Sequence, residues 1–217
     1  MIIAIDGPAA SGKSTIAKLI SKKLEFEYLD TGALYRGVTY LIYINDLSLN
    51  NEDMVVDLIK KTEFSFNNNH LLINGNNVET KIRKNNISKL VSAVASTQYI
   101  RTILTEIERK IGHQAKNIIM DGRDIGTVVF PDAEVKIFLT ASTRVRALRR
   151  YNELLKKNEI HTIEEIERDI IKRDEIDSKR ATAPLVKSDD AIEVNTDNLN
   201  IEGVVEVILS IINKKIV

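Results

Sequence analysis

The segment that most constrains the fold lies near the start of the chain, where residues 7–15 are GPAASGKST. It fits the phosphate-binding pattern G-x-x-x-x-G-K-[ST]. The apolar run 2–5 precedes it, and apolar residues follow it at helical spacing. Strand, loop and helix therefore occur in the order that a phosphate-binding loop requires. The alternative is a glycine-containing turn before an ordinary helix, and the two flanks favour the phosphate loop.

This loop predicts a site for a nucleoside triphosphate. In such a loop, backbone N–H groups surround the phosphates and the helix N-terminus adds partial positive charge. Lys13 would reach the terminal phosphates, and the Ser14 hydroxyl would ligate Mg²⁺. The predicted nucleotide-binding residues are Gly7, Pro8, Ala9, Ala10, Ser11, Gly12, Lys13, Ser14 and Thr15.

Length and composition predict one domain that can bury a sizeable core, because the chain has 217 residues of which 43% are apolar. Basic and acidic residues both number 31, so no global field favours nucleic acid or an anionic membrane. There is no cysteine, which excludes disulfides and thiol nucleophiles. The N-terminus lacks the basic flank of a signal peptide, and Glu206 interrupts the apolar stretch 204–212. We expect a soluble cytoplasmic protein without a membrane partner.

Alternating apolar runs and helical patterns predict an α/β fold with a doubly wound parallel sheet. The predicted strands are 2–6, 26–29, 118–121, 135–139 and 192–194. The predicted helices are 13–24, 33–44, 100–111, 143–157, 163–177 and 201–213. Thr162 and Glu165 fit a capping box at the start of one of them.

Residues 45–94 do not follow this alternation of strands and helices. Phe64, Ser65 and Phe66 alternate, and the apolar run 71–73 leads into Asn74-Gly75, a hairpin-type turn. This segment predicts a small, mostly β insertion between the second and third strands of the main sheet.

Charged clusters recur near the expected carboxyl ends of the parallel strands, where ligands bind in such sheets. In the first cluster, Asp30 and Thr31 can cap the following helix, and Arg36 lies within reach of a bound phosphate. A second cluster pairs Ser92 with Arg101. Arginine side chains suit bidentate recognition of phosphate. If the bound triphosphate donates a phosphoryl group, these clusters therefore favour an acceptor molecule that already carries a phosphate.

The third cluster follows the strand that ends in Asp121, a position that resembles the carboxylate that holds Mg²⁺ through water in nucleotide-binding loops. The alternative is a cap on the following turn. Gly122 and Gly126 bracket Arg123 and Asp124, which favours two charged side chains aimed into a cleft over a plain surface salt bridge.

The fourth cluster places Arg173, Asp177 and Arg180 on one helical face, at spacings of four and three residues. An exposed ion-pair stripe is the alternative. The segment 181–185, ATAPL, ends the helix and argues for a defined position in the fold.

Five segments together resemble the bacterial cytidylate kinases: GPAASGKST, LDTGALYR, VSAVASTQYIR, DGRDIGTVVFPDA and KRDEIDSKRATAPL. The resemblance implies a P-loop nucleoside monophosphate kinase fold with a five-stranded sheet in the order 2-3-1-4-5. It also implies a core at about 1–38 and 95–217, a monophosphate-binding insertion at about 45–94, and a short helical lid at about 151–162. Arg149 and Arg150 would approach the transferred phosphoryl group from the lid, or else form an exposed basic helix end.

The same resemblance implies roles for the charged clusters. Thr31, in place of a serine in many members, would hydrogen-bond the acceptor nucleotide. Three arginines would hold the monophosphate and the transferring group: Arg36, Arg123 and Arg180. The cytosine would be surrounded by Ser92, Arg101 and Asp124, and the ribose hydroxyls would be held by Arg173 and Asp177. Ala10 stands where several relatives carry glycine.

The implied reaction is transfer of a phosphoryl group from ATP to CMP, with dCMP as a second acceptor. Lys13, Arg123 and Arg180 would be catalytic, and Ser14 and Asp121 would hold Mg²⁺. Asp124 would accept a hydrogen bond from the cytosine amino group and disfavour uracil. A monomer without a nucleic-acid partner is expected. The alternatives are a P-loop kinase for shikimate or a nucleoside, and a nucleotide-dependent switch, although no N-K-x-D segment reads guanine.

Overall fold

The computed structural model describes residues 1–156 and 158–216. The chain forms two compact units, one made of Met1–Tyr28 and Lys116–Val217 and the other of Leu29–Ala115. The expected division into one kinase domain with an insertion at 45–94 stays a prediction.

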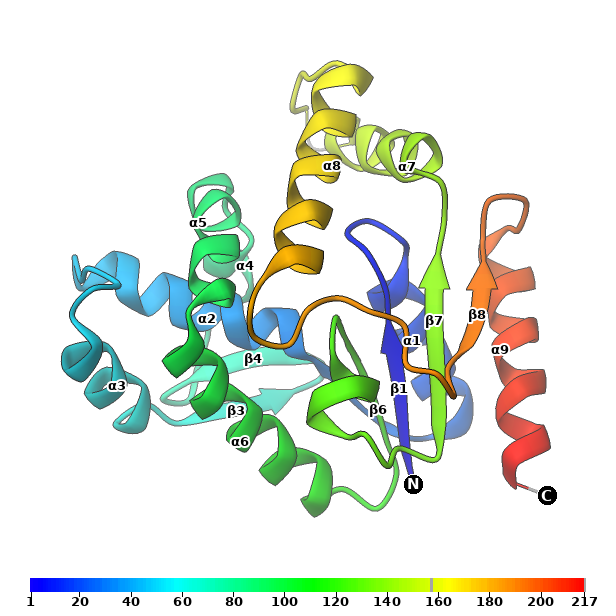
Figure 1. The fold of residues 1–217 in the computed structure, drawn as a ribbon, viewed down its shortest axis with the longest axis horizontal. Coiled ribbons are helices and arrows are strands. Elements are labelled where there is room, and N and C mark those ends of the chain that lie inside the picture. Colours follow the sequence, from blue (N-terminus) through cyan, green and yellow to red (C-terminus); the bar gives the residue numbers. More distant parts are fainter. Residues whose placement is uncertain (157, 217) are drawn as a thin grey trace. The chain divides into compact units, whose positions relative to one another are not determined.

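Within the described residues, the first unit is built on a parallel five-stranded sheet (Figure 1). Its strands are β1 (Ile2–Asp6), β2 (Glu27–Asp30), β6 (Ile118–Gly122), β7 (Val135–Thr140) and β8 (Ile192–Asn195), in the order β2-β6-β1-β7-β8. This order confirms the predicted one. The chain passes into the second unit within β2, after Tyr28. Strand β1 pairs with both β6 and β7, and Asp6 lies in register with Gly122 and Phe138. The loops that follow β1 and β6 therefore start side by side.

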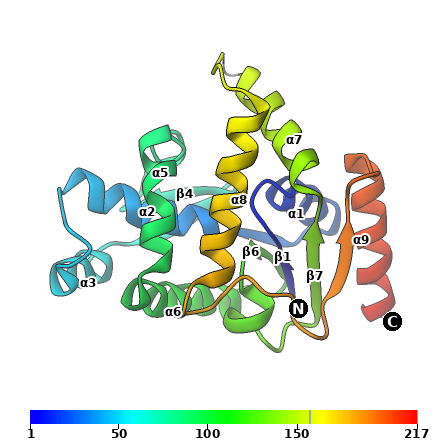
Figure 2. The ribbon, with the colours of Figure 1, turned by 45° about the horizontal axis from the view of Figure 1, so that its top comes forward.

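The helices of this unit bury apolar faces in its core. The helices of the unit are α1 (Lys13–Leu24), α7 (Thr143–Leu155), α8 (Ile163–Lys179) and α9 (Ile201–Ile216), and a π-helix, η1, spans Ile125–Val129. Ile16 and Ile20 of α1 pack in one core with Ile208 and Ile212 of α9, because each pair is four residues apart and shares a helix face. In Figures 1 and 2, α9 lies along the β8 edge of the sheet.

Helices α7 and α8 pack on each other through Ala147, Leu154, Ile166 and Ile170. The predicted capping box starts α8: the Glu165 amide donates to Oγ1 of Thr162 at 3.2 Å, and the Thr162 amide donates to Oε2 of Glu165 at 3.0 Å. The predicted lid, 151–162, includes residue 157, which lies outside the described residues. Its described part is the end of α7 and the approach to α8, and its role stays a prediction.

The second unit combines helices with a small antiparallel sheet. Its helices are α2 (Thr31–Ile44), α3 (Glu52–Lys60), α4 (Glu79–Ile82), α5 (Asn85–Ser96) and α6 (Gln98–Gln114). The sheet joins β3 (Phe64–Asn67), β4 (His70–Ile73) and β5 (Asn76–Asn77) in that order. The predicted turn is confirmed, because Asn74 and Gly75 connect β4 to β5 with φ angles of 49° and 75°.

The segment 45–94 contains more helix than the sequence predicts, since α3, α4 and most of α5 lie in it beside the antiparallel sheet. Helix α3 is short but buries Val55 and Ile59, which are four residues apart. Helix α2 starts at Thr31, two residues before the predicted start, because the Asp30 carboxylate caps it by accepting from the Ala33 amide at 3.1 Å.

Helix α2 lies directly on the small sheet. A Cβ atom at Gly37 would lie 2.6 Å from Cδ2 of Leu71, which is closer than two non-bonded carbon atoms approach in proteins. Glycine at this position therefore sets the distance between α2 and β4.

Candidate active site

The phosphate loop connects β1 to α1, and two of its glycines have conformations that other residues rarely adopt. Gly7 has a φ of 150°, and a Cβ atom there would lie 2.1 Å from the Leu139 carbonyl oxygen. Gly12 has a φ of 94° and directly precedes α1. The glycines of the pattern thus allow the sharp path from strand to helix.

Lys13 is buried at the first position of α1, and its ammonium group is bound by the loop. Its Nζ atom donates to the Pro8 carbonyl at 2.7 Å and to Oγ of Ser11 at 3.3 Å. Burial, followed by the charge of Arg123, lowers the pKa of Lys13 well below its usual value, while Asp121 opposes the shift. The charged form of Lys13 is therefore disfavoured mainly by burial, and an anionic ligand beside it would favour that form.

Ser14 and Asp121, the two predicted metal ligands, are in contact. Ser14 Oγ donates to Oδ2 of Asp121 at 2.8 Å, and the Tyr28 hydroxyl donates to Oδ1 at 2.6 Å. Hydroxyl and carboxylate oxygens are the hard donors that Mg²⁺ prefers, so the pair fits the predicted ion. Tyr28 was not predicted, because its position in β2 is typical of a core residue and its contact with Asp121 depends on the order of the strands.

Four predicted residues form a buried ion-pair network between the turn after β6 and the end of α8. Arg123 Nε donates to Oδ2 of Asp177 at 2.9 Å. Arg180 Nη2 lies 3.3 Å from Oδ1 of Asp124, and Arg180 Nη1 lies 3.8 Å from Oδ1 of Asp177. The exposed fractions of the Arg180, Asp124 and Asp177 side chains are 4%, 6% and 8%. This burial does not fit an exposed ion-pair stripe.

The charges in this network stabilise one another. Burial tends to raise the pKa of Asp177, but the charges of Arg123, Arg173 and Arg180 outweigh it and lower the pKa below its usual value. Burial tends to lower the pKa of Arg123, and the carboxylates of Asp177, Asp121 and Asp174 raise it. Both groups therefore stay charged.

Arg173, one turn before Asp177 on α8, is less well satisfied. Its Nε atom is buried and has no hydrogen-bond partner among the described residues. Burial, and then the charge of Arg123, lowers its pKa to about 10. An unbonded guanidinium N–H beside other cations favours a site for an anionic or hydroxyl-bearing ligand.

The first unit thus brings together eight predicted residues: Lys13, Ser14, Asp121, Arg123, Asp124, Arg173, Asp177 and Arg180. The remaining residues predicted to bind the acceptor, Thr31, Arg36, Ser92 and Arg101, belong to the second unit.

In the second unit, the predicted arginines are held by side chains and carbonyls of their neighbours. Arg36 Nη1 donates to Oγ of Ser88 at 2.9 Å, one turn before Ser92 on α5. Arg101 Nη1 donates to the Ala95 carbonyl at 3.0 Å, and its guanidinium lies 5.1 Å from the centre of the Tyr35 ring. Helix α5 therefore contacts both arginines.

Comparison with known proteins covers nearly the whole chain. A sequence model of the family described as cytidylate kinase matches residues 3–214. The chain belongs to the cytidylate kinase family. The cytidylate kinase of Alkaliphilus oremlandii is 49% identical over 210 residues, covering 97% of this chain and 96% of its own length. That of Clostridioides difficile is 46% identical over 213 residues, covering 98% of both chains.

A solved structure, that of an uncharacterized protein from Eubacterium ventriosum, aligns with 99% of this chain and 98% of its own, with a TM-score of 0.54 and 13% identity. This likeness supports the fold alone. Along the described part of the chain, every helix is too short or too polar to cross a bilayer.

Asp6 is a buried residue of this kinase that the sequence did not single out. Its two carboxylate oxygens accept from the Ile125 amide at 2.9 Å and the Gly126 amide at 2.7 Å. Burial raises the pKa of Asp6 to about 6, although these two hydrogen bonds act to lower it. The carboxylate thus fixes the start of η1, directly after Arg123 and Asp124.

Arg83 is a second residue of the kinase that the sequence did not single out. Its Nη2 atom donates to Oδ2 of Asp30 at 2.7 Å, and its Nε atom donates to Oε1 of Glu79 at 2.7 Å. It therefore supports the carboxylate that caps α2.

The two arginines expected near the lid both have partners: Arg149 bonds a residue after β8, and Arg150 pairs with a residue of the predicted lid itself. Arg149 donates to the Thr196 hydroxyl at 2.9 Å and to the Thr196 carbonyl at 2.7 Å, and Arg150 pairs with Glu153 at 3.0 Å. Their approach to the transferred phosphoryl group stays a prediction.

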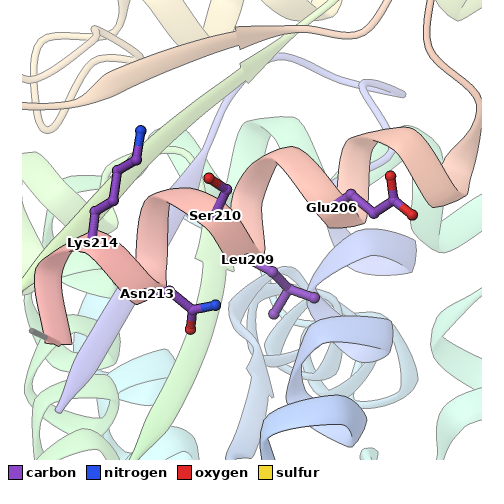
Figure 3. Close-up of a pocket in the computed structure, with 5 residues that line it drawn as sticks. All are labelled: Glu206, Leu209, Ser210, Asn213 and Lys214. Atoms are coloured by element: carbon purple, nitrogen blue, oxygen red, sulfur yellow. The ribbon is translucent and has the colours of Figure 1, made fainter.

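A surface hollow lies along α9 of the kinase, away from this chemistry (Figure 3). Its lining residues are Glu206, Leu209, Ser210, Asn213 and Lys214. Because all of them come from one helix and none belongs to the buried polar network, the network is the better candidate for the active site.

Proposed function

We propose that this kinase transfers the γ-phosphoryl group of ATP to CMP, and to dCMP as a second acceptor, in pyrimidine nucleotide metabolism. The observation that carries the proposal is the buried cluster in which Arg123, Arg173 and Arg180 meet two carboxylates, with Arg123 close enough to Lys13 to lower its pKa. Such a concentration of cations suits two nucleotides whose phosphates face each other.

The donor would be held by the phosphate loop. Backbone amides and Lys13 would bind its phosphates, and Ser14 and Asp121 would hold Mg²⁺. When bound, Mg²⁺ supplies positive charge next to the phosphate oxygens. The hydrogen bond from Tyr28 to Asp121 would keep the carboxylate turned toward Ser14.

The acceptor phosphate would be the nucleophile, and since it is already an anion, the protein need not supply a general base. Arg36, Arg123 and Arg180 would orient it and neutralise the charge of the transferring group. The bond between Asp177 and Arg123 would hold that guanidinium in place before the nucleotides bind.

The base would be selected by Asp124 together with Ser92 and Arg101. An ionised carboxylate accepts from the amino group of cytosine but faces a carbonyl oxygen in uracil, which leaves two acceptors opposed. The ion pair with Arg180 holds this carboxylate in a fixed orientation. Arg173 and Asp177 would contact the ribose hydroxyls, so dCMP would lose one contact.

In this proposal the kinase acts as a cytoplasmic monomer, without a nucleic-acid or membrane partner. The equal numbers of basic and acidic residues, 31 of each, support the absence of a nucleic-acid or anionic-membrane partner.

The test is an initial-rate assay of ADP formation with ATP and Mg²⁺ against CMP, dCMP, UMP and AMP. We expect the highest kcat/KM with CMP, a lower value with dCMP, and a value for UMP that is lower by up to about 10⁴-fold. Chelation of Mg²⁺ with EDTA should abolish turnover. Equal rates with CMP and UMP, or no turnover with any monophosphate, would contradict the proposal.

A further inference from the structure

Asp174, which is not among the predicted site residues, connects α8 to the phosphate loop. Its Oδ1 atom accepts from the Ala9 amide at 3.0 Å. Its Oδ2 atom accepts from Arg146 Nη1 at 2.5 Å. One carboxylate therefore joins the backbone of the loop to an arginine of α7.

Arg146 completes this connection from the other side. The same Nη1 atom donates to the Ala9 carbonyl at 2.9 Å, and Nε donates to the Ala141 carbonyl at 2.9 Å. Both backbone polar groups of Ala9 are thus bound by one ion pair that is largely withdrawn from solvent, with exposed fractions of 7% for Arg146 and 20% for Asp174, unlike a surface pair.

Packing supports the same connection. Ala10, the next residue of the loop, packs against the apolar cluster between α7 and α8, which includes Ala147 and Ile170. A shift of the loop at Ala9 or Ala10 would therefore have to move these helices, or break both the ion pair and the apolar contact.

Helix α8 also carries residues predicted to bind the acceptor. Arg173 is adjacent to Asp174, and Asp177 lies three residues further on. The charge of Asp174 acts on both Arg123 and Arg173. Asp174 thus contacts the donor loop directly and stands among the groups of the acceptor side.

We propose that Asp174 is a positioning residue that couples the two nucleotide sites, so that CMP bound beside α8 raises the affinity of the phosphate loop for ATP, and the reverse. This inference rests on the proposed function. Because coupling between two sites is reciprocal, each nucleotide must change the affinity for the other by the same factor, which is typically about 5- to 150-fold.

The experiment measures the coupling factor by calorimetry on the full chain. The dissociation constant of a non-hydrolysable ATP analogue with Mg²⁺ is determined with and without saturating CMP, in the wild type and in Asp174→Asn. Asparagine can still accept from the Ala9 amide through its oxygen, but its NH₂ group opposes Arg146. We expect CMP to tighten analogue binding at least about fivefold in the wild type and less than about twofold in the variant.

Glu167→Gln is the matched control. Glu167 joins the same two helices by pairing with Arg144 at 3.1 Å, but on an exposed face away from the loop. This variant should keep the coupling factor of the wild type. A loss that is equal in both variants would assign the effect to general packing of α7 on α8 and overturn the proposal.

A second measurement uses the wild type alone, so that it does not depend on the folding of a variant. Addition of CMP without ATP should slow hydrogen exchange of the Ala9 amide, because the Asp174 bond to it would be more persistent. Unchanged exchange in the presence of bound CMP, or full coupling in Asp174→Asn, would refute the role of Asp174. Failure of the wild type to bind CMP at all would instead refute the proposed function.

Discussion

The Nε atom of Arg123 lies 2.9 Å from Oδ2 of Asp177, which joins the turn after β6 to the last turns of α8. Arg180, at the end of α8, lies 3.8 Å from the other oxygen of the same carboxylate. Two arginines that are predicted to hold phosphate thus depend on one aspartate. The consequence is that Asp177 should orient the phosphate-binding groups in addition to its predicted contact with the ribose.

Asp177→Asn should lower kcat/KM for CMP by about 100-fold, since small displacements of positioning groups have effects of that size. The KM for ATP should change less than about threefold, because Lys13 is held by Pro8 and Ser11 of its own loop. Steady-state kinetics with each substrate varied in turn would show this split. Asp169→Asn, at an exposed position of the same helix, serves as the control. Equal losses for both substrates would contradict the prediction.

Asp124→Asn should shift the acceptor preference toward UMP. The amide NH₂ can donate to the uracil carbonyl, whereas it opposes the amino group of cytosine. An unsatisfied buried polar group costs about 1–3 kcal/mol, so the ratio of kcat/KM for CMP over UMP should fall by about tenfold or more. Rates with both acceptors at fixed ATP would measure it. An unchanged ratio would mean that Asp124 supports Arg180 and does not contact the base.

The unfolding free energy of the kinase should depend on pH through the titration of Asp6. Its pKa is about 6 in the folded protein and 3.8 as a reference, so the folded state binds the proton more tightly. The stability that this proton provides is complete below pH 3.8 and is lost as the pH rises through about 6. A difference of about two pKa units corresponds to about 3 kcal/mol of unfolding free energy at pH 7.

Asp6→Asn removes this titration, so the stability advantage of the wild type over the variant should shrink as the pH rises from 4.5 to 7.5, by about 2 kcal/mol. Urea unfolding at several pH values, without nucleotide or metal, gives the two curves. Asp189→Asn, at an exposed position, should leave the pH dependence as it is. Parallel curves for the wild type and Asp6→Asn would rule out an elevated pKa at Asp6.

Tyr28→Phe should weaken the response of the enzyme to Mg²⁺. The variant loses the 2.6 Å bond that orients Asp121, and loss of such a supporting bond typically lowers metal affinity by about tenfold or more. Titration of activity with Mg²⁺ at saturating ATP and CMP would measure the shift. Tyr43→Phe is the control, because Tyr43 is exposed on α2. Identical Mg²⁺ curves for Tyr28→Phe and the wild type would contradict this role.

The phosphate loop should tolerate a change at Ala10 but not at Gly7. In Gly7→Ala, the new Cβ meets the backbone oxygen of Leu139, and we expect a loss of about 3 kcal/mol in unfolding free energy. Ala10 has a φ of 58°, so Ala10→Gly relieves backbone strain while adding chain entropy and losing a packed methyl group. The net change should be below about 1 kcal/mol. Denaturant unfolding compares the two, and a Gly7→Ala variant as stable as Ala10→Gly would show that the loop relaxes.

The main sheet and its helices could be predicted because their sequence patterns are local. The bounds of β1 and α1 agree with the prediction, since apolar runs and the glycines of the loop mark both ends. Helix α6 extends from Gln98 to Gln114, beyond the predicted 100–111, because its ends carry polar residues that contribute nothing to an apolar pattern. Helices α3 and α4 were missed because they have only nine and four residues. Helix α5 has 12 residues, and the helical spacing of its buried Ile87, Val91 and Val94 was a signal that could have found it.

The supporting residues of the site could not be predicted from spacing. Tyr28 is 93 residues from Asp121, Asp6 is 119 residues from Ile125, and Ala9 is 165 residues from Asp174. No periodic pattern connects positions so far apart, and only the order of the strands and the packing of α7 on α8 bring them together. The site residues that the resemblance implies could be predicted because each lies in one of a few short sequence segments.

The contact between Gly37 and Leu71 limits how kinases of this architecture can vary. While β4 lies against α2, a side chain at position 37 would meet Cδ2 of Leu71, so a mutation there must be accompanied by repacking of Leu71 or by displacement of the hairpin. A lineage that discards the antiparallel sheet frees this helix position for alanine or any other good helix former. The glycine and the hairpin should therefore be inherited, or lost, together.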